Sequence, residues 1–196
     1  REAADLLKTL AAARYNIFVS GGTGAGKTTF LNALSEFIPP EERVITIEDS
    51  AELQIHGIEN LVRMEVRQAD GDGVSNVTLR DLIRTSLRMR PDRIIVGEVR
   101  GEEALDMIQS MNTGHDGSLS TGHANSPQDM LSRLETMALF ASDIPIQAIR
   151  KQIASSIDII VQLERLRDRS RRVTAIAEVL DCTEDAYILN PIFEFH

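Results

Sequence analysis

The residues best suited to chemistry in this sequence form a glycine-rich run that ends in a lysine and two threonines, residues 21–29. Residues 21–28 fit the pattern G-x-x-x-x-G-K-[ST] at every position. Glycines leave the space in which backbone N–H groups approach a phosphate chain, and they tolerate positive φ. A helix that begins near Lys27 would point the positive end of its dipole at the same anion. The run therefore predicts a site for a nucleoside triphosphate.

Within this loop, Lys27 is expected to reach the β- and γ-phosphates, and the Thr28 hydroxyl is expected to ligate Mg²⁺. The alternative is a glycine-rich turn that only connects two elements. The apolar segments 16–20 and 27–37 read as a strand and a helix, which is the context that the motif requires. We expect every residue of the loop to contact the nucleotide: Gly21, Gly22, Thr23, Gly24, Ala25, Gly26, Lys27, Thr28 and Thr29.

Acidic side chains follow two later apolar segments, 43–47 and 93–96. In an open α/β sheet, chemistry lies beyond the carboxyl ends of the strands, so Glu48 is a candidate catalytic residue. The alternative is a polar loop in which Asp49 or Ser50 caps a turn. Many P-loop enzymes carry an Asp that holds Mg²⁺ through water at the end of the second segment. Here Gly97 takes that place, so Glu98 becomes the candidate, with a structural pair to Arg100 as the alternative.

A histidine follows a further short apolar segment, 118–121, and is flanked by small residues. In that position His123 could sense or stabilise a γ-phosphate. A lone histidine is usually structural, and its spacing does not decide between the two interpretations.

The periodicity of the whole chain predicts an α/β fold: a mostly parallel sheet flanked by helices, with antiparallel strands added near the C-terminus. The basic link 164–171 is predicted to be a solvated hairpin tip, with a docking role for its arginines as the alternative. Residues 68–77 are predicted to be a flexible surface loop without metal-ligand spacing. The expected helices are 2–13, 27–37, 78–89, 102–113, 126–140 and 145–156, and the expected strands are 16–20, 43–47, 61–66, 93–98, 118–121, 157–163, 172–181 and 186–195.

Composition limits the class of protein. The 196 residues fit one domain, and a formal net charge of −9 argues against a sequence-independent grip on nucleic acid. The single cysteine, Cys182, excludes an internal disulfide, is typical of a reducing cytoplasm, and is predicted to be a buried, unreactive thiol. There is no apolar run long enough to span a bilayer and no signal-peptide pattern. The missing initiator methionine predicts either a trimmed chain or the C-terminal part of a longer protein.

Four segments taken in order, the P-loop, IEDSAEL, RPDRIIVGEVRG and GSLSTGHANS, resemble the type II/IV secretion ATPases, with the CpaF/TadA branch of tight-adherence pili the most similar. The resemblance covers the whole chain and implies a RecA-like C-terminal ATPase domain over 1–196, with the N-terminal domain absent. It implies a Mg²⁺-dependent ATPase in which Glu48 belongs to an Asp box that positions water, Glu98 is the Walker B glutamate, and His123 belongs to the His box.

The resemblance also implies a homo-hexamer in the cytoplasm that works with inner-membrane platform proteins of a pilus or secretion machine. In such a ring, an arginine from an adjacent subunit would speed phosphoryl transfer. Two alternatives stay open: a RecA-like ATPase that translocates DNA or RNA, and a regulatory switch that binds nucleotide without hydrolysis. The sequence does not choose among the candidate arginines, which are Arg63, Arg67, Arg88, Arg90 and Arg100.

Overall fold

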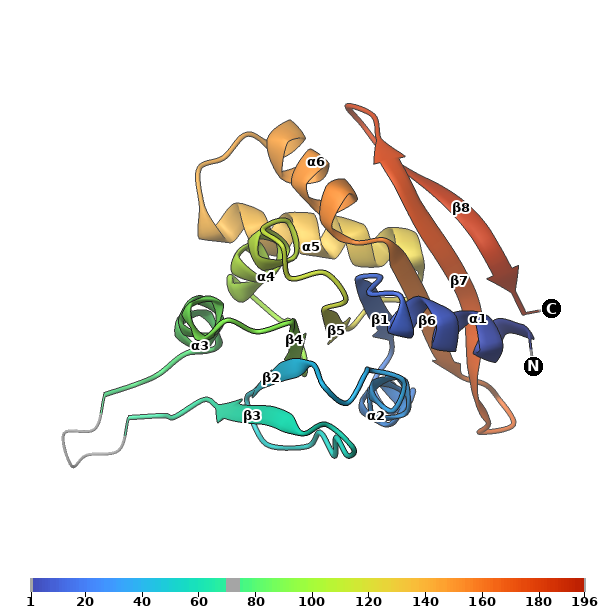
Figure 1. Cartoon of the computed structure of the whole chain (residues 1–196). Coiled ribbons are helices and arrows are strands. Elements are labelled where there is room, and N and C mark those ends of the chain that lie inside the picture. Colours follow the sequence, from blue (N-terminus) through green and yellow to red (C-terminus); the bar gives the residue numbers. More distant parts are fainter. Residues whose placement is uncertain (1, 70–74, 196) are drawn as a thin grey trace.

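The computed structural model describes residues 2–69 and 75–195. These residues form one eight-stranded sheet in the order β3-β2-β4-β5-β1-β6-β7-β8, with helices on both faces (Figure 1). The strands are β1 (Ile17–Gly21), β2 (Arg43–Glu48), β3 (Asn60–Glu65), β4 (Arg93–Val96), β5 (Leu119–Gly122), β6 (Ile159–Arg165), β7 (Arg171–Cys182) and β8 (Tyr187–Glu194). The helices are α1 (Glu2–Ala12), α2 (Lys27–Ser35), α3 (Leu79–Ser86), α4 (Glu103–Met111), α5 (Pro127–Ala141) and α6 (Ile146–Ser156), with a 3₁₀ turn, η1 (Leu87–Met89), after α3.

The sheet is parallel from β3 across to β6 and antiparallel from β6 to β8. Each parallel neighbour needs a crossover, whereas β6, β7 and β8 follow one another through short turns. The predicted α/β fold with antiparallel strands at its C-terminal end is therefore confirmed.

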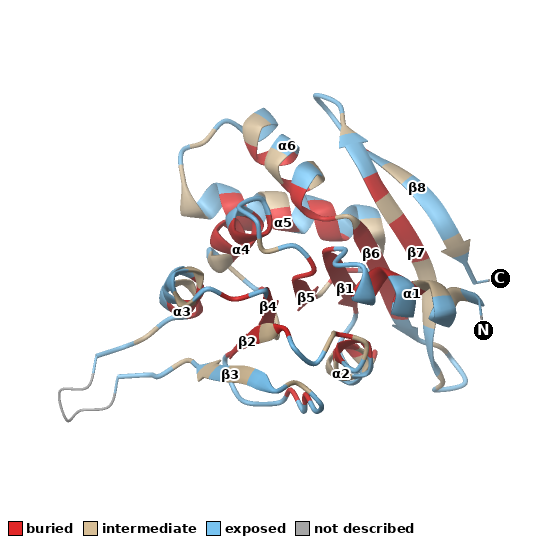
Figure 2. Cartoon of the chain, in the orientation of Figure 1, coloured by how far each residue is buried: buried red, intermediate tan, exposed pale blue. Residues whose placement is uncertain are grey.

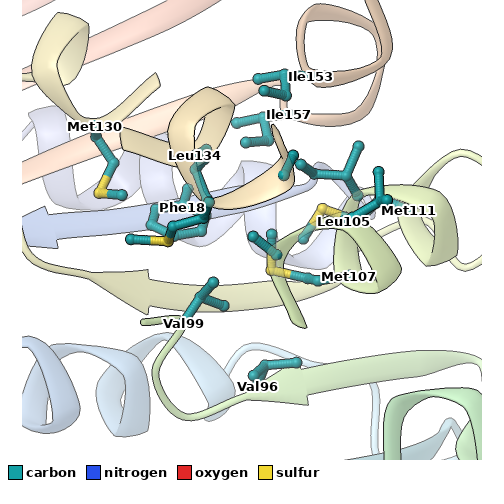
Figure 3. Close-up of a cluster of buried hydrophobic side chains, with 14 of the residues drawn as sticks. Phe18, Val96, Val99, Leu105, Met107, Met111, Met130, Leu134, Ile153 and Ile157 are labelled. Atoms are coloured by element: carbon teal, nitrogen blue, oxygen red, sulfur yellow. The ribbon is translucent and has the colours of Figure 1, made fainter. Parts of the chain in front are cut away.

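Alternate residues of the central strands supply two hydrophobic cores, one on each face of the sheet. Ile17 and Val19 of β1 pack with α1 and α2. Phe18, between them in sequence, packs on the opposite face with α3 to α6. Figure 2 shows that the central strands are almost wholly buried, and Figure 3 shows Phe18 and Leu134 of α5 within the second cluster. Helices on both faces bury both sides of the parallel strands, which explains why these strands read as continuous apolar runs.

Every predicted helix and strand is present, with ends that differ by at most three residues. Helix α2 ends at Ser35 rather than at 37, because Phe37 and Ile38 donate to Leu34 and Ser35 in tighter i→i−3 bonds before the two prolines. The predicted helix 78–89 becomes 3₁₀ from Leu87, ahead of a left-handed residue and Pro91.

The predicted surface loop 68–77 lies partly outside the described residues, because 70–74 are not described. Its flanks pair through an isolated bridge between Arg67 and Val77. Cys182 ends β7 and is partly rather than fully buried, because it lies at the strand's last position; its environment raises the pKa of the thiol mainly through burial. Within the described residues, no helix has the length and apolar character needed to cross a membrane.

A buried arginine joins four segments at the amino ends of the strands. Arg93, at the start of β4, is fully buried and pairs with the carboxylate of Glu42. It also donates to the carbonyl oxygens of Ala11, at 2.7 Å, and Gly117, at 3.2 Å. Arg93 therefore links α1, the start of β2, β4 and the turn before β5 at the amino ends of the strands, which is the end of the sheet opposite the P-loop.

Candidate active site

The predicted phosphate loop lies between β1 and α2. Gly24 and Gly26 have φ of 73° and 94°, the left-handed region that favours glycine. Because the cap position of α2 is Gly26, no side chain accepts the first N–H groups of the helix, and they stay available to an anion. Lys27 is buried at the start of α2, and its ammonium donates to the carbonyl oxygens of Gly21, at 2.9 Å, and Gly22, at 3.2 Å.

Two residues predicted from later segments meet this lysine. His123, directly after β5, places its Nδ1 3.3 Å from Lys27 Nζ. Its Nε2 lies 2.6 Å from Glu98 Oε1, on the turn after β4. This approach is not an aligned hydrogen bond, since Oε1 is a buried acceptor without a hydrogen-bond donor among the described residues. The structure therefore brings Lys27, His123 and Glu98 together, as the sequence predicted for an active site.

The electrostatics of the cluster favour one protonation pattern. Burial lowers the pKa of Lys27, and the charge of Glu98 opposes that effect. Burial and the charge of Lys27 also lower the pKa of His123. Burial alone would raise the pKa of Glu98, but the hydrogen bond and charge of Arg100 and the charge of Lys27 outweigh it, so the pKa falls. These directions leave His123 neutral and Glu98 ionised at neutral pH.

Among the five candidate arginines, Arg100 contacts the site of its own chain. Its guanidinium lies 2.6 Å from Glu98 Oε2 and 3.7 Å from Asp49 Oδ2. The other four are exposed; Arg63 donates to Ile55 and Arg67 to Ser75. The structural pair between Glu98 and Arg100, which the sequence left as an alternative, is present together with the contact to His123.

Glu48 lies at the end of β2 and is buried, with 5% of its surface exposed. One oxygen, Oε1, accepts hydrogen bonds from the backbone N–H groups of Glu52, at 3.0 Å, and Leu53, at 2.8 Å. The buried carboxylate thus fixes the backbone of the loop that follows β2 at Glu52 and Leu53.

The loop that Glu48 holds presents a second glutamate to the P-loop. Glu52 is exposed, and its Oε2 accepts from the hydroxyl of Thr28, the predicted metal ligand, at 3.4 Å. Sequence reasoning missed Glu52 as a separate candidate because two glutamates in one short cluster give no spacing that distinguishes them. The position of Glu52 in the loop after β2 was the one sequence feature that could have pointed to it, since only a residue beyond the end of the strand can reach α2.

The acidic groups near Thr28 fit a magnesium ion that is bound mainly through phosphates and water. The described residues hold no group of three or more His, Cys, Asp or Glu side chains with metal-ligand geometry. Mg²⁺ in nucleotide sites needs only one or two protein groups besides the phosphates. Thr28 and the carboxylate of Glu98, which both line the cleft beside the P-loop, satisfy that requirement.

The β6–β7 hairpin also reaches this site, which corrects part of the prediction for residues 164–171. Its turn is exposed, as predicted, but Arg171 at the start of β7 folds back over the P-loop. Arg171 Nε donates to Gly24 O at 3.0 Å. The cleft beside the P-loop is lined by Thr23, Gly24, Gly26, Lys27, Thr28, Thr29, Glu52, Glu98, Thr121, His123 and Arg171.

Comparison with known proteins agrees with this geometry. A sequence profile described as "Type II/IV secretion system protein" matches residues 1–188. A putative conjugal transfer protein of Mycobacterium tuberculosis is 41% identical over 175 residues, covering 89% of this chain and 49% of that protein. The type IV secretion system protein PtlH of Bordetella pertussis is 39% identical over 171 residues, covering 86% and 50%.

Solved structures give the same result. The VirB11 ATPase of the Brucella suis type IV secretion system superposes with a TM-score of 0.80 at 34% identity, covering 90% of this chain and 53% of that one. The pilus retraction motor PilT shares the fold, with a TM-score of 0.65 at 22% identity, covering 95% and 49%.

Fold and site together define a P-loop nucleotide-binding protein. Since the family profile covers almost the whole chain, the chain belongs to the type II/IV secretion system protein family. The chain spans about half the length of the curated relatives it matches, 49% and 50% for the two named above.

Proposed function

We propose that this chain is the ATP-hydrolysing domain of a hexameric traffic ATPase that powers pilus assembly or protein secretion across the bacterial envelope. The observation that carries the proposal is the contact of Lys27 with His123 and of His123 with Glu98, 3.3 and 2.6 Å long, at the mouth of a P-loop. Similarity to the VirB11 ATPase and to PtlH, which their descriptions place in type IV secretion systems, supports the choice of machine.

In this proposal, the P-loop amides and Lys27 hold the phosphates, and Thr28 ligates Mg²⁺. When bound, the ion would supply neutralisation of charge on the transferred phosphoryl group. The Glu98 carboxylate, in the same cleft, would accept a hydrogen bond from a water of that ion. Neutral His123 lies between Glu98 and Lys27, where it can contact the γ-phosphate without adding a charge. Phosphoryl transfer then depends on positioning and on neutralising charge rather than on a covalent intermediate.

In this proposal, the acidic loop after β2, which contains Glu52, positions the attacking water. Glu48 was the candidate from the sequence, and both of the N–H groups that it binds belong to that loop. Glu52 is the glutamate of the loop that reaches Thr28. We therefore propose that Glu52 orients the attacking water and that Glu48 positions Glu52.

The wider assembly follows from the family. We propose a homo-hexamer in which the N-terminal domain and an arginine of a neighbouring subunit complete the site. The protein would lie in the cytoplasm, docked peripherally on inner-membrane platform proteins. Within the family, we propose the CpaF/TadA branch of tight-adherence pili, on the strength of the sequence motifs given above.

The decisive experiment measures the ATPase rate against protein concentration in the assembled protein. We expect the specific activity to rise steeply as rings form, and Lys27→Ala to lose both ATP binding and turnover. Activity that is independent of concentration would contradict the shared site. Stimulation by single-stranded DNA, with salt-sensitive binding, would instead favour the nucleic-acid-translocating alternative, and tight ATP binding without turnover in assembled rings would favour the regulatory switch.

A further inference from the structure

The β6–β7 hairpin supplies a second positive charge to the P-loop, from a residue 147 positions away in the sequence. We propose that Arg171 binds the α-phosphate of the nucleotide, the part shared by ATP and ADP, and so sets nucleotide affinity without taking part in hydrolysis. This inference rests on the proposed function, since it requires the P-loop to hold a nucleotide.

The hairpin is built to pack on the P-loop. A Cβ on Gly21 would lie 2.5 Å from Leu163 O of β6, and a Cβ on Gly26 would lie 3.2 Å from Arg171 Cδ. Two glycines of the motif therefore leave room for the hairpin as well as for phosphate. A Cβ at Gly21 would clash with the backbone of β6, whereas a Cβ at Gly26 would require a small shift of the Arg171 side chain.

The position of Arg171 is fixed by a tight turn. Leu166 N donates to Ser170 O at 2.8 Å, closing the hairpin. Asp168 Oδ1 accepts from both the N–H and the hydroxyl of Ser170, at 2.9 and 2.7 Å. Arg169 takes the left-handed conformation that the turn requires, with φ of 68°. Arg171 therefore starts β7 from a defined backbone, which limits the conformational entropy that it loses on binding a ligand.

Arg171 lines the same cleft as Lys27, Glu98 and His123, but its hydrogen bond goes to the P-loop backbone at Gly24 rather than to those side chains. A pocket on one side of the P-loop is lined by Thr28, Glu48, Glu52, Glu98 and Arg100, and a pocket on the other by Gly22, Thr23 and His123, and neither includes Arg171. Arg171 contacts Gly24 and approaches Gly26, next to Thr28 and Thr29 in the central cleft. Lys27, His123 and Glu98 mark the γ-phosphate end, so Arg171 marks the end that carries the nucleoside.

The charge of Arg171 is available to a ligand. Its Nε donates a hydrogen bond to Gly24 O. Among the residues that the structure describes, no carboxylate lies within ion-pair distance of its guanidinium. The remaining fork nitrogens match the geometry of phosphate oxygens. Because ADP and ATP present the same α-phosphate, the contact strengthens binding equally before and after hydrolysis.

The test compares Arg171→Ala with Arg172→Ala in the assembled protein. Arg172 is the matched control: it has the same charge, is one residue further along β7, and its guanidinium lies over Phe195, 5.6 Å from the ring centroid. We expect Arg171→Ala to weaken ADP and ATP binding, measured by calorimetry, by about tenfold and to raise KM similarly, with kcat within twofold, the pattern for uniform binding. Arg172→Ala should change neither beyond twofold.

Three outcomes separate the explanations. If Arg171→Ala lowers kcat and leaves KM unchanged, the arginine only braces the loop and the inference is wrong. If it behaves like Arg172→Ala while Lys27→Ala abolishes ADP binding, the P-loop function stands and this inference alone fails. If the wild-type protein binds no nucleotide, the proposed function fails as well. Arg171→Lys, which keeps the charge and the stem, should recover at least half of the lost binding free energy, and no recovery would contradict a phosphate contact.

Discussion

The side chain of Glu48 occupies the space that a side chain at Gly97 would need. A Cβ on Gly97 would lie 3.0 Å from Glu48 Cγ and 3.4 Å from its Oε1. The contact arises because β2 and β4 are parallel neighbours, with Ile47 beside Val96. The next residues, Glu48 and Gly97, therefore meet at the carboxyl ends of the two strands. The place where many P-loop enzymes carry an Asp is glycine here because a carboxylate from the adjacent strand already lies there.

This contact makes Gly97→Ala a test of how the acidic loop is positioned. The added methyl group would displace the Glu48 carboxylate and loosen its bonds to the N–H groups of Glu52 and Leu53. We expect about a tenfold loss in kcat with ADP affinity unchanged, because the contact requires a shift well below 1 Å and a misplacement of about 1 Å costs about 100-fold in rate. Gly101→Ala is the control, since its Cβ would meet only the carboxylate end of Glu103, at 3.3 Å. Equal activity of the two variants would contradict the positioning role.

Replacing each glutamate of the loop by glutamine separates their roles. Glu52→Gln should bind ATP with wild-type affinity and lose at least 100-fold in turnover, the size expected for a group that assists proton transfer. Glu48→Gln keeps an amide oxygen that can still accept both backbone N–H bonds, so we expect a loss of about tenfold or less. ATPase rates of assembled rings decide the question: a deeper loss for Glu48→Gln would restore it as the water-positioning residue.

His123 should make stability depend on pH below neutrality. Its pKa lies below the ordinary value of 6.5, mainly through burial, so the unfolded chain binds a proton that the folded chain does not. The contribution of His123 to stability is therefore lost as the pH falls from about 6.5 toward the folded pKa. Glu98, whose pKa is lowered from 4.5, acts in a separate and more acidic window. Melting temperatures between pH 7.5 and 5.5 should fall less steeply for His123→Gln than for the wild type, and identical slopes would contradict this.

The buried Arg93–Glu42 ion pair, at the amino ends of the strands, should affect folding stability without affecting nucleotide binding. Glu42→Ala leaves the guanidinium of Arg93 buried without its carboxylate, which costs about 3–5 kcal/mol. Arg14→Ala is the control, because Arg14 contacts the same Glu42 at 3.2 Å from a side chain that is 43% exposed, where a pair contributes less than about 1 kcal/mol. Urea unfolding measures both, and ADP affinity should stay within twofold of wild type in each variant. If Glu42→Ala lowers the free energy of unfolding by less than about 1 kcal/mol, the stabilising role of the Arg93–Glu42 ion pair is contradicted.

The sequence predicted the part of the site that lies on strand ends, because strand, loop and helix signals are local. Glu98 and His123 come within two residues of an apolar segment, and Lys27 begins the helix after the glycine loop. A parallel sheet brings such residues together at the carboxyl ends of its strands. Glu52 and Arg171 were not predicted as site residues because each reaches the P-loop through a loop or turn whose path depends on packing. A basic hairpin reads as solvated unless one knows that two P-loop glycines leave room for it.

The order of strands also determines how the site can respond to hydrolysis. Glu48 ends β2, Glu98 and His123 come just after β4 and β5, and Lys27 begins the helix that follows β1. These four strands are consecutive neighbours in the sheet. Neighbouring strands lie about 4.8 Å apart, so the backbone ladder fixes the spacing of the strand ends that carry these groups. These strands are interior to the sheet and covered on both faces, and none can slide without breaking hydrogen bonds on two sides. If the proposed function holds, loss of the γ-phosphate would act on the sheet as a unit, and we expect this domain to move as one rigid body rather than by bending of any one strand.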